Sequence, residues 1–270
     1  MVLKFRKAFT LIELITVIFI IGLIASIAIV VMTGTRTKAK LAAGQSFDAS
    51  TYRAVGDQLV GEWLFDEGSG TVAKDTTGNH NGTIVGATWT TGVSGGALNF
   101  TPGSYVSLGS DLLLNPPNFT ITAWVKPGDF SGSYNYIYSN SRDCCGAYNG
   151  IDFFISGNTP GGIIWNGGET YMPSSTKISN DPIWTFVALS YSGSVLALYV
   201  NGQLVKSAAS TLGVGSPASW PNYIGAMGAG PGSYGMNGAI DQVRLYGGAI
   251  TAMGVHRLYV KEKNVRLAEK

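Results

Sequence analysis

The stretch IWTFVALSYSGSVLALYVNGQLV, residues 183–205, decides the fold class of most of the chain. Two apolar segments of strand length are separated by Ser192-Gly193, and Asn201-Gly202 follows the second segment. Asn-Gly is a strong signal for a two-residue hairpin turn, because both positions of that turn need positive φ. The stretch therefore predicts neighbouring antiparallel strands rather than helices.

Similar strands are expected from about Gln58 onward. Apolar residues alternate in FTITAWVKP (119–127), so one face of this strand is predicted to be buried. The other expected strands are 59–66, 82–89, 105–109, 150–156, 183–191, 195–201, 203–208, 222–228 and 238–246. No long helical pattern separates them, which favours an antiparallel β-sandwich.

The composition agrees with many short strands and does not suggest an electrostatic partner. The 270 residues include 37 glycines, and only 13% of the residues are charged. The formal net charge is +2, and three cations (Lys4, Arg6 and Lys7) lie before Phe9. A balance this close to neutral gives no basis for expecting a nucleic-acid partner.

The N-terminal part has a different pattern. Residues 9–32, FTLIELITVIFIIGLIASIAIVVM, form a nearly continuous apolar run. As a helix, about 24 residues extend roughly 36 Å, which is enough to cross a bilayer core. Glu13 interrupts the run, and a carboxylate at that depth costs about 3 kcal/mol or more unless it finds a partner. Cleavage between Ala8 and Phe9 would create an α-ammonium group four residues from Glu13. This group, on the same helix or on a neighbouring one, could neutralise the carboxylate.

KAFTLIELITVIFIIGLIA (7–25) resembles the N-terminus of type IV pilins and pseudopilins. The resemblance implies that prepilin peptidase cleaves between Ala8 and Phe9, that Phe9 is N-methylated, and that Glu13 guides subunit assembly. It also implies insertion in the bacterial inner membrane, with the head outside the cytoplasm, followed by assembly with other pilin-like subunits at the cell surface. A plain signal anchor is the alternative, but it does not explain Glu13.

The resemblance divides the N-terminal part into a leader (1–8) and a transmembrane and assembly helix with its stem (9–53). The polar stem from Thr33 to Arg53 is expected to continue the helix, with a flexible linker as the alternative.

The order of motifs in the head resembles the laminin G-like, concanavalin A-like jelly-roll family. The motifs are GEWLFDEGSGTVAKDTTGNHNGTIVGATW (61–89), GGALNFTPGSYVSLG (95–109), FTITAWVKP (119–127), the stretch 183–205 and MNGAIDQVRLYGGAI (236–250). The resemblance implies a jelly-roll β-sandwich over 58–259, closed by a short helix, and residues 260–270 are then expected to form a solvated tail.

The same resemblance implies a structural Ca²⁺ ion between the first loop and the last strand. The loop DTTGNHNG (75–82) is rich in oxygen donors, which suits a hard cation. Asp75 and Asp241 are the expected ligands, with Asn79 and Gly82 contributing, in part through carbonyl groups. Alternatively, Asp75 caps a turn and Asp241 accepts hydrogen bonds from neighbouring backbone amides.

Aromatic residues between 134 and 173 are candidates for ligand binding. Tyr136, Tyr148, Trp165 and Tyr171, together with the nearby Tyr134, lie among Asn, Asp and Gly residues. Such rings stack on sugars or anchor a protein partner, although each could instead fill the core.

The only two cysteines, Cys144 and Cys145, are adjacent. They could form a vicinal disulfide, remain reduced or pair with another subunit.

Catalysis is not expected. Glu62, Asp66 and Glu67 do not share one strand face, as paired glycosidase carboxylates would. His80 lacks a Ser or Cys partner at recognisable spacing and is expected at the surface of its loop.

Together, the two resemblances predict a filament subunit, a minor pilin or adhesin, whose head binds a glycan or surface protein. The alternative is a pseudopilin of a secretion or DNA-uptake system, and a membrane-tethered glycan hydrolase is disfavoured.

Overall fold

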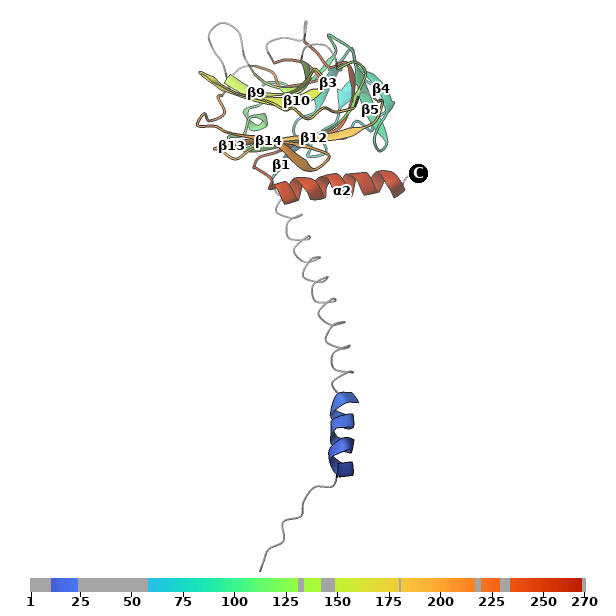
Figure 1. Ribbon diagram of the computed structural model, residues 1–270. Coiled ribbons are helices and arrows are strands. Elements are labelled where there is room, and N and C mark those ends of the chain that lie inside the picture. Colours follow the sequence, from blue (N-terminus) through green and yellow to red (C-terminus); the bar gives the residue numbers. More distant parts are fainter. Residues whose placement is uncertain are drawn as a thin grey trace, which may run out of the picture. The chain divides into compact units, whose positions relative to one another are not determined.

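The computed structural model describes residues 11–23, 58–130, 134–141, 149–179, 181–216, 220–228 and 234–268 (Figure 1). The chain divides into two compact units, Met1–Arg53 and Ala54–Lys270. The second unit, called the head below, contains all of the strands found in the described residues.

Residues 11–23 of the first unit form an α-helix. Its large apolar side chains are exposed in the single chain, from 48% for Val17 to 75% for Leu11. An apolar surface of this kind is stable only in lipid or against other apolar helices. Within the described residues, no helix combines the length and the hydropathy that a membrane span requires. Residues 24–32 of the predicted span lie outside the described residues.

The head is a sandwich of two eight-stranded sheets, in which all strand pairs are antiparallel. The first sheet has the order β14 (Gln203–Ala209), β13 (Val195–Val200), β12 (Thr185–Tyr191), β7 (Phe119–Pro127), β16 (Gly238–Tyr246), β5 (Gly96–Phe100) and β4 (Thr88–Thr91), and β1 (Leu59–Trp63) also pairs with β16. The second has the order β11 (Glu169–Pro173), β10 (Thr159–Asn166), β9 (Asn149–Ser156), β8 (Asn135–Ser139), β15 (Tyr223–Ile224), β6 (Tyr105–Ser107), β3 (Gly82–Val85) and β2 (Val72–Ala73). A short 3₁₀ helix, η1 (Leu112–Leu114), follows β6. The predicted antiparallel sandwich is thus confirmed.

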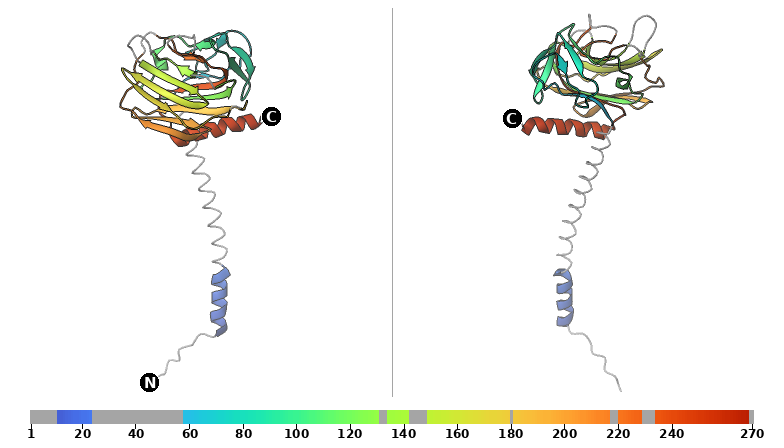
Figure 2. Two further views of the ribbon diagram at one scale, coloured as in Figure 1. Left: turned by 45° about the horizontal axis from the view of Figure 1, so that its top comes forward. Right: turned by 180° about the vertical axis from the view of Figure 1, so that it is seen from behind.

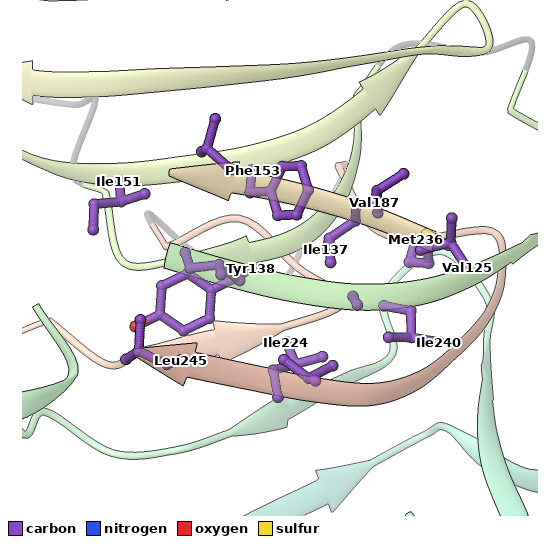
Figure 3. Packing of buried hydrophobic residues seen from close by; sticks show 14 of the residues in the cluster. Val125, Ile137, Tyr138, Ile151, Phe153, Val187, Ile224, Met236, Ile240 and Leu245 are labelled. Carbon is purple, nitrogen blue, oxygen red and sulfur yellow. The ribbon is translucent and has the colours of Figure 1, made fainter. Parts of the chain in front are cut away.

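The main core lies between the two sheets, where apolar side chains from both inner faces meet (Figure 3). In β9, Ile151, Phe153 and Ile155 belong to this core. Because successive side chains of a strand point to opposite faces, Asp152 and Phe154 lie on the outer face of the second sheet. This alternation positions the site described below.

The C-terminal helix α2 (Ala252–Ala268) covers the outer face of the first sheet (Figure 2). Val255 and Leu258 pack there in a second cluster with Trp124 of β7 and Phe186 of β12. The expectation of a solvated tail from residue 260 is wrong, because the helix continues to Ala268 and Glu262 is buried.

Glu262 is buried because it joins an ionic network with the sheet. Arg244 of β16 lies 2.6 Å from Glu262 and 2.6 Å from Glu62 of β1, measured between guanidinium nitrogen and carboxylate oxygen. The indole N–H of Trp124 donates to the other oxygen of Glu262 at 2.5 Å. Burial alone would lower the pKa of Arg244, but the charges of Glu262 and Glu62 raise it above its ordinary value.

The Asn201-Gly202 turn is confirmed: both residues have positive φ, 48° and 73°, and Val200 pairs with Gln203. The single strand expected over 82–89 is wrong. The chain turns at Gly86, where φ is 70°, and passes from β3 of the second sheet to β4 of the first. A left-handed conformation is easily reached only by glycine, so the chain can change sheets there.

Candidate binding pocket and cation site

The strand register brings aromatic and acidic side chains together on the outer face of β8–β11. Trp165 of β10 pairs with Glu169 of β11, and in the next row of that face Asp152, Ile163 and Tyr171 pair in line across β9, β10 and β11. Because all of these positions point outward, they gather into one surface. In the third row Tyr136 of β8 pairs with Phe154.

Glycine in the third row leaves room for an aromatic ring. Gly161 of β10 pairs with Phe154, and a Cβ atom at Gly161 would lie 2.7 Å from the Phe154 ring. The ring therefore lies over the glycine and stacks on Tyr171, with centroids 6.2 Å apart and planes 11° apart. Tyr134 meets the edge of Phe154 at 4.8 Å and 80°.

These residues enclose a pocket of about 270 Å³, called the aromatic pocket below. Its described lining is Tyr134, Tyr136, Asp152, Ile163, Trp165, Glu169 and Tyr171. A pocket smaller than the 300–1,000 Å³ typical of drug-sized ligands suits a single ring or a small group.

Asp152 is held rigidly at the base of the aromatic pocket and is 1% exposed. The hydroxyl groups of Ser139 and Ser141 donate to its Oδ1 at 2.6 and 2.7 Å, and Nε1 of Trp165 donates to its Oδ2 at 2.7 Å. These bonds satisfy a buried carboxylate and fix the orientation of the Trp165 ring.

The ionisation of Tyr134 is affected by its neighbours in the aromatic pocket. The side-chain hydrogen bond with Tyr171 and burial raise the pKa of Tyr134 to about 12, and the charges of Glu169 and Asp152 add to this effect. The deprotonated, anionic form of Tyr134 is therefore disfavoured.

The structure brings together three of the four predicted ligand-binding residues, Tyr136, Trp165 and Tyr171. Tyr148, Cys144 and Cys145 lie outside the described residues. Sequence reasoning missed Asp152 and Glu169. Asp152 lies within the predicted strand 150–156, between two apolar residues of the core face, and that alternation was the available signal.

The loop 75–82, expected to bind calcium, is organised by hydrogen bonds to Asp75. Its carboxylate accepts from the backbone N–H groups of Glu62, Thr77, Asn79 and His80 at 2.9, 3.0, 3.3 and 3.0 Å. Burial alone would raise the pKa of Asp75, but these bonds, together with the hydroxyl of Thr77, lower it. Asp75 therefore organises the turn of its own loop.

The other residues of this loop also have structural roles. A Cβ atom at Gly82 would lie 2.4 Å from Val106, so close packing accounts for this glycine. His80 was expected at the surface, and this is wrong: it is buried, with Nδ1 3.2 Å from Asp75 and Nε2 3.3 Å from Asp111.

Asp241 lies in a separate network with Asp66, around the turn that joins β4 and β5. Oδ2 of Asp241 accepts from the backbone N–H of Val93 at 2.7 Å, and Oδ1 of Asp66 accepts from the N–H of Gly96 at 2.8 Å. Gly92 fits against Oδ2 of Asp241, which a Cβ atom would approach to 2.5 Å. Burial raises the pKa of Asp241 to about 8, three backbone N–H groups partly offset this, and the charge of Asp66 raises it further.

The loop around Asp75 and the network around Asp241 differ in how well they suit a calcium ion. Oδ1 of Asp241 has no hydrogen-bond partner although the residue is fully buried, and Asp66 supplies a second carboxylate nearby. An unsatisfied carboxylate oxygen beside another carboxylate and backbone carbonyls suits Ca²⁺. Among the described residues there is no group of three or more His, Cys, Asp or Glu side chains that could hold a metal. A cation there would need carbonyl or water ligands as well, and Asp75 belongs to the other network.

The carboxylates considered for catalysis are each engaged elsewhere. Glu62 pairs with Arg244, Asp66 binds the Gly96 amide, and an oxygen of Glu67 accepts from the N–H of Lys74 at 2.7 Å.

At the N-terminus, Glu13 lies in the helix 11–23, whereas Ala8 and Phe9 lie outside the described residues. Residues 3–29 match the prokaryotic N-terminal methylation motif. This is the type IV prepilin motif, and it implies prepilin peptidase processing, membrane insertion and pilin-type assembly.

Solved structures similar to this chain share the fold of the head. Domain 4 of AbnA, a GH43 extracellular arabinanase from Geobacillus stearothermophilus, solved in complex with arabinotriose, is 20% identical with a TM-score of 0.59, covering 75% of this chain and 98% of that chain. The binding domain of Paraclostridial Mosquitocidal Protein 1 is 18% identical with a TM-score of 0.62. The match covers 76% of this chain and 52% of that chain. The CBM40 of Ruminococcus gnavus IT-sialidase bound to α2,3-sialyllactose is 12% identical with a TM-score of 0.52. The match covers 60% of this chain and 96% of that chain.

No curated protein matches the chain. Residues 100–256, more than half of the chain, match the family described as the concanavalin A-like lectin/glucanases superfamily. The chain therefore belongs to the concanavalin A-like lectin/glucanases superfamily and carries a type IV prepilin methylation motif at its N-terminus.

Proposed function

We propose that this protein is a minor subunit of a type IV pilus-like filament and that its head is an adhesin for glycans. The observation that carries the proposal is the occurrence, in one chain, of the methylation motif at residues 3–29 and of an aromatic pocket on a lectin-like head. The methylation motif implies surface assembly, and a head at the cell surface could meet ligands through the aromatic pocket.

The composition of the aromatic pocket supports carbohydrate binding. Rings such as Trp165 and Tyr171 stack on sugar faces, and fixed carboxylates such as Asp152 accept hydrogen bonds from sugar hydroxyls. Two proteins of the same fold were solved with arabinotriose and with sialyllactose, which supports a glycan over another ligand class.

We propose binding rather than catalysis. Glycoside hydrolysis needs two carboxyl groups that flank one scissile bond, one of them positioned as acid and the other as nucleophile or base. Glu62 is held by an ion pair with Arg244, and Asp66 by the amide of Gly96, so neither is positioned for such a pair. Incubation of the chain with its glycan and analysis of the products should return the glycan unchanged.

A structural Ca²⁺ ion is also proposed, with Asp241 and Asp66 as its protein carboxylates. The support is the unsatisfied Oδ1 of Asp241, which is fully buried beside a second acidic group. When bound, the ion would neutralise both carboxylates and tie β16 to the turn between β4 and β5. Its role in the proposal is stability, not chemistry.

Mass spectrometry of the mature N-terminus tests the filament function. The expected result is a chain that begins with N-methylated Phe9. Glu13→Ala should leave membrane insertion intact and impair recruitment into filaments, and Glu13→Asp serves as the charge-preserving control. A chain that keeps its first eight residues, in a cell that processes other prepilins, would refute the proposal.

Glycan-array binding of the full chain in detergent tests the adhesin function. Binding that is lost on Trp165→Ala would support it. A folded chain that binds no glycan would favour the alternative, a pseudopilin with a structural head.

A further inference from the structure

The aromatic contacts around the aromatic pocket continue beyond its lining. Tyr134, which lines the pocket, meets a further ring, Tyr234, with centroids 6.5 Å apart and planes 80° apart. Tyr234 does not belong to the described lining and is 45% exposed. Tyr171, which stacks on Phe154, is exposed to a similar extent, 43%. Two open rings, Tyr171 and Tyr234, are therefore joined by a continuous series of aromatic contacts through Phe154 and Tyr134.

The ring of Tyr234 has surface available for a ligand. In an edge-to-face pair each ring covers at most one face of its neighbour, so the contact with Tyr134 leaves at least one face of Tyr234 uncovered. The 45% exposure of the residue agrees with an open face. A flat aromatic surface that is open to solvent is a platform on which a sugar ring can stack.

The backbone that follows Tyr234 is anchored in the head. Gly235 pairs with Ala226 in an isolated bridge, and the N–H of Met236 donates to the carbonyl of Gly225 at 2.8 Å. The side chain of Met236 is fully buried in the main core. Tyr234 is therefore attached to a fixed part of the fold, which lowers the entropy that a ligand must pay to order it.

The size of the aromatic pocket limits how much of a glycan it can hold. A volume of about 270 Å³ suits one sugar ring. Because Tyr134 lines the pocket and also contacts Tyr234, the open ring lies directly beside a pocket wall. A second sugar residue, linked to the one in the pocket, can therefore reach the Tyr234 ring.

We propose that Tyr234 forms a second stacking subsite, through which the head selects oligosaccharides over monosaccharides. One sugar residue occupies the aromatic pocket, and the residue linked to it stacks on Tyr234. This inference rests on the proposed glycan-binding function and specifies the ligand class of the same site.

The test compares monosaccharides with disaccharides on the full chain in detergent. The probes are arabinose with arabinobiose and galactose with lactose, because two proteins of the same fold were solved with arabinotriose and with sialyllactose. Ligand-observed NMR titration would measure the affinities, since it extends to weak binding. We expect the disaccharide of a series that binds to have an affinity about two- to twelvefold higher than its monosaccharide, the contribution of one stacked aromatic pair.

Substitutions connect this gain to one ring. Tyr234→Ala should remove the difference between disaccharide and monosaccharide and leave the affinity for the monosaccharide unchanged, because the aromatic pocket is intact. Tyr234→Phe keeps the ring and should keep the gain. Trp165→Ala should weaken the binding of both sugars, since Trp165 lines the pocket. Leu204→Ala, a change at a 52% exposed residue of β14 in the first sheet, is the control and should change neither affinity.

The outcomes separate the two proposals. If the monosaccharide binds as tightly as the disaccharide, or if Tyr234→Ala leaves the ratio of affinities unchanged, the second subsite is refuted and glycan binding stands. A glycan identified by the array would be compared with its own monosaccharides in the same way. If neither series binds and the glycan array is also negative, the glycan-binding function is refuted, and the second subsite with it.

Discussion

Replacing Arg244 by leucine should destabilise the head by removing the cation between α2 and the first sheet. Arg244 connects Glu62 of β1 with Glu262 of α2, and its side chain is only 13% exposed. Removing one member of a buried ion pair costs about 3–5 kcal/mol, because the remaining charge is buried without compensation. Glu262 would keep its bond from Trp124, and Glu62 is partly exposed, so we expect a loss near the lower limit, about 3 kcal/mol.

The loss should depend on pH with a defined sign. Burial raises the pKa of Glu262 above its ordinary value, and the charge of Arg244 and the bond from Trp124 offset part of that increase. Without Arg244 the pKa of folded Glu262 rises further above the value in the unfolded chain. The folded state then binds the proton more tightly, so the unfolding free energy falls as pH rises between those two values. The loss should therefore be larger at pH 8 than at pH 5.

Urea unfolding of the head, residues 54–270, followed by tryptophan fluorescence, would measure this effect. Lys206→Leu removes an exposed cation of β14 and should change the unfolding free energy by no more than about 0.5 kcal/mol. Adding Glu262→Gln to Arg244→Leu should recover part of the loss, since the uncompensated charge is removed. A change within about 0.5 kcal/mol at pH 8, or a loss that grows toward pH 5, would refute the reasoning.

Three further predictions concern the two candidate sites. Tyr171→Ala should weaken glycan binding by about 0.5–1.5 kcal/mol in calorimetry, the contribution of one stacked aromatic pair, and equal affinity would contradict its role. Gly161→Ala should displace the Phe154 ring, 2.7 Å from the new Cβ atom, and cost about 1–3 kcal/mol of stability in urea unfolding. Calcium at about 100 times its dissociation constant should stabilise the wild-type head by about 2.7 kcal/mol and leave Asp241→Asn unchanged, and equal stabilisation of both would remove Asp241 from the site.

The central strands could be predicted from sequence to the residue. The bounds of β7 and β16 agree with the predicted 119–127 and 238–246. Both strands are long and run through the middle of the first sheet, so their composition is set by burial and is readable locally. The hairpin at Asn201-Gly202 was predictable for a similar reason, because the turn type requires its own residues.

Among the strands that form the aromatic pocket, β9 was predicted as 150–156, but β8, β10 and β11 were not. β10 contains Pro160, Gly161 and Gly162, which locally indicate a turn. In the structure a Cβ atom at Gly161 would collide with Phe154 of the neighbouring strand, and one at Gly162 with Leu189 of the opposite sheet, at 2.5 Å. These glycines are therefore explained by contacts with distant residues, which a local pattern does not contain.

The candidate cation site has the same dependence on distant residues. Asp66 and Asp241 are brought together only by the pairing of β4, β5 and β16 into one sheet. The sequence grouped Asp241 with Asp75, since the loop 75–82 has the richer set of oxygen donors, whereas in the structure the two carboxylates accept hydrogen bonds from different loops. Counting donors did not reveal that Asp75 is occupied by the amides of its own loop.

The two outer faces of the sandwich are used differently, and this difference argues for a binding role. α2 closes the outer face of the first sheet with apolar contacts and a buried ionic network. On the second sheet, Tyr171 is 43% exposed and Tyr134 and Trp165 are only partly buried around Asp152, although packing in the core would remove more of their surface from water. Open aromatic rings beside a rigidly held carboxylate add nothing to stability that apolar packing would not supply better. A ligand that stacks on the rings and donates a hydrogen bond to the carboxylate would account for both features, and this supports the proposal that the head binds through its second sheet.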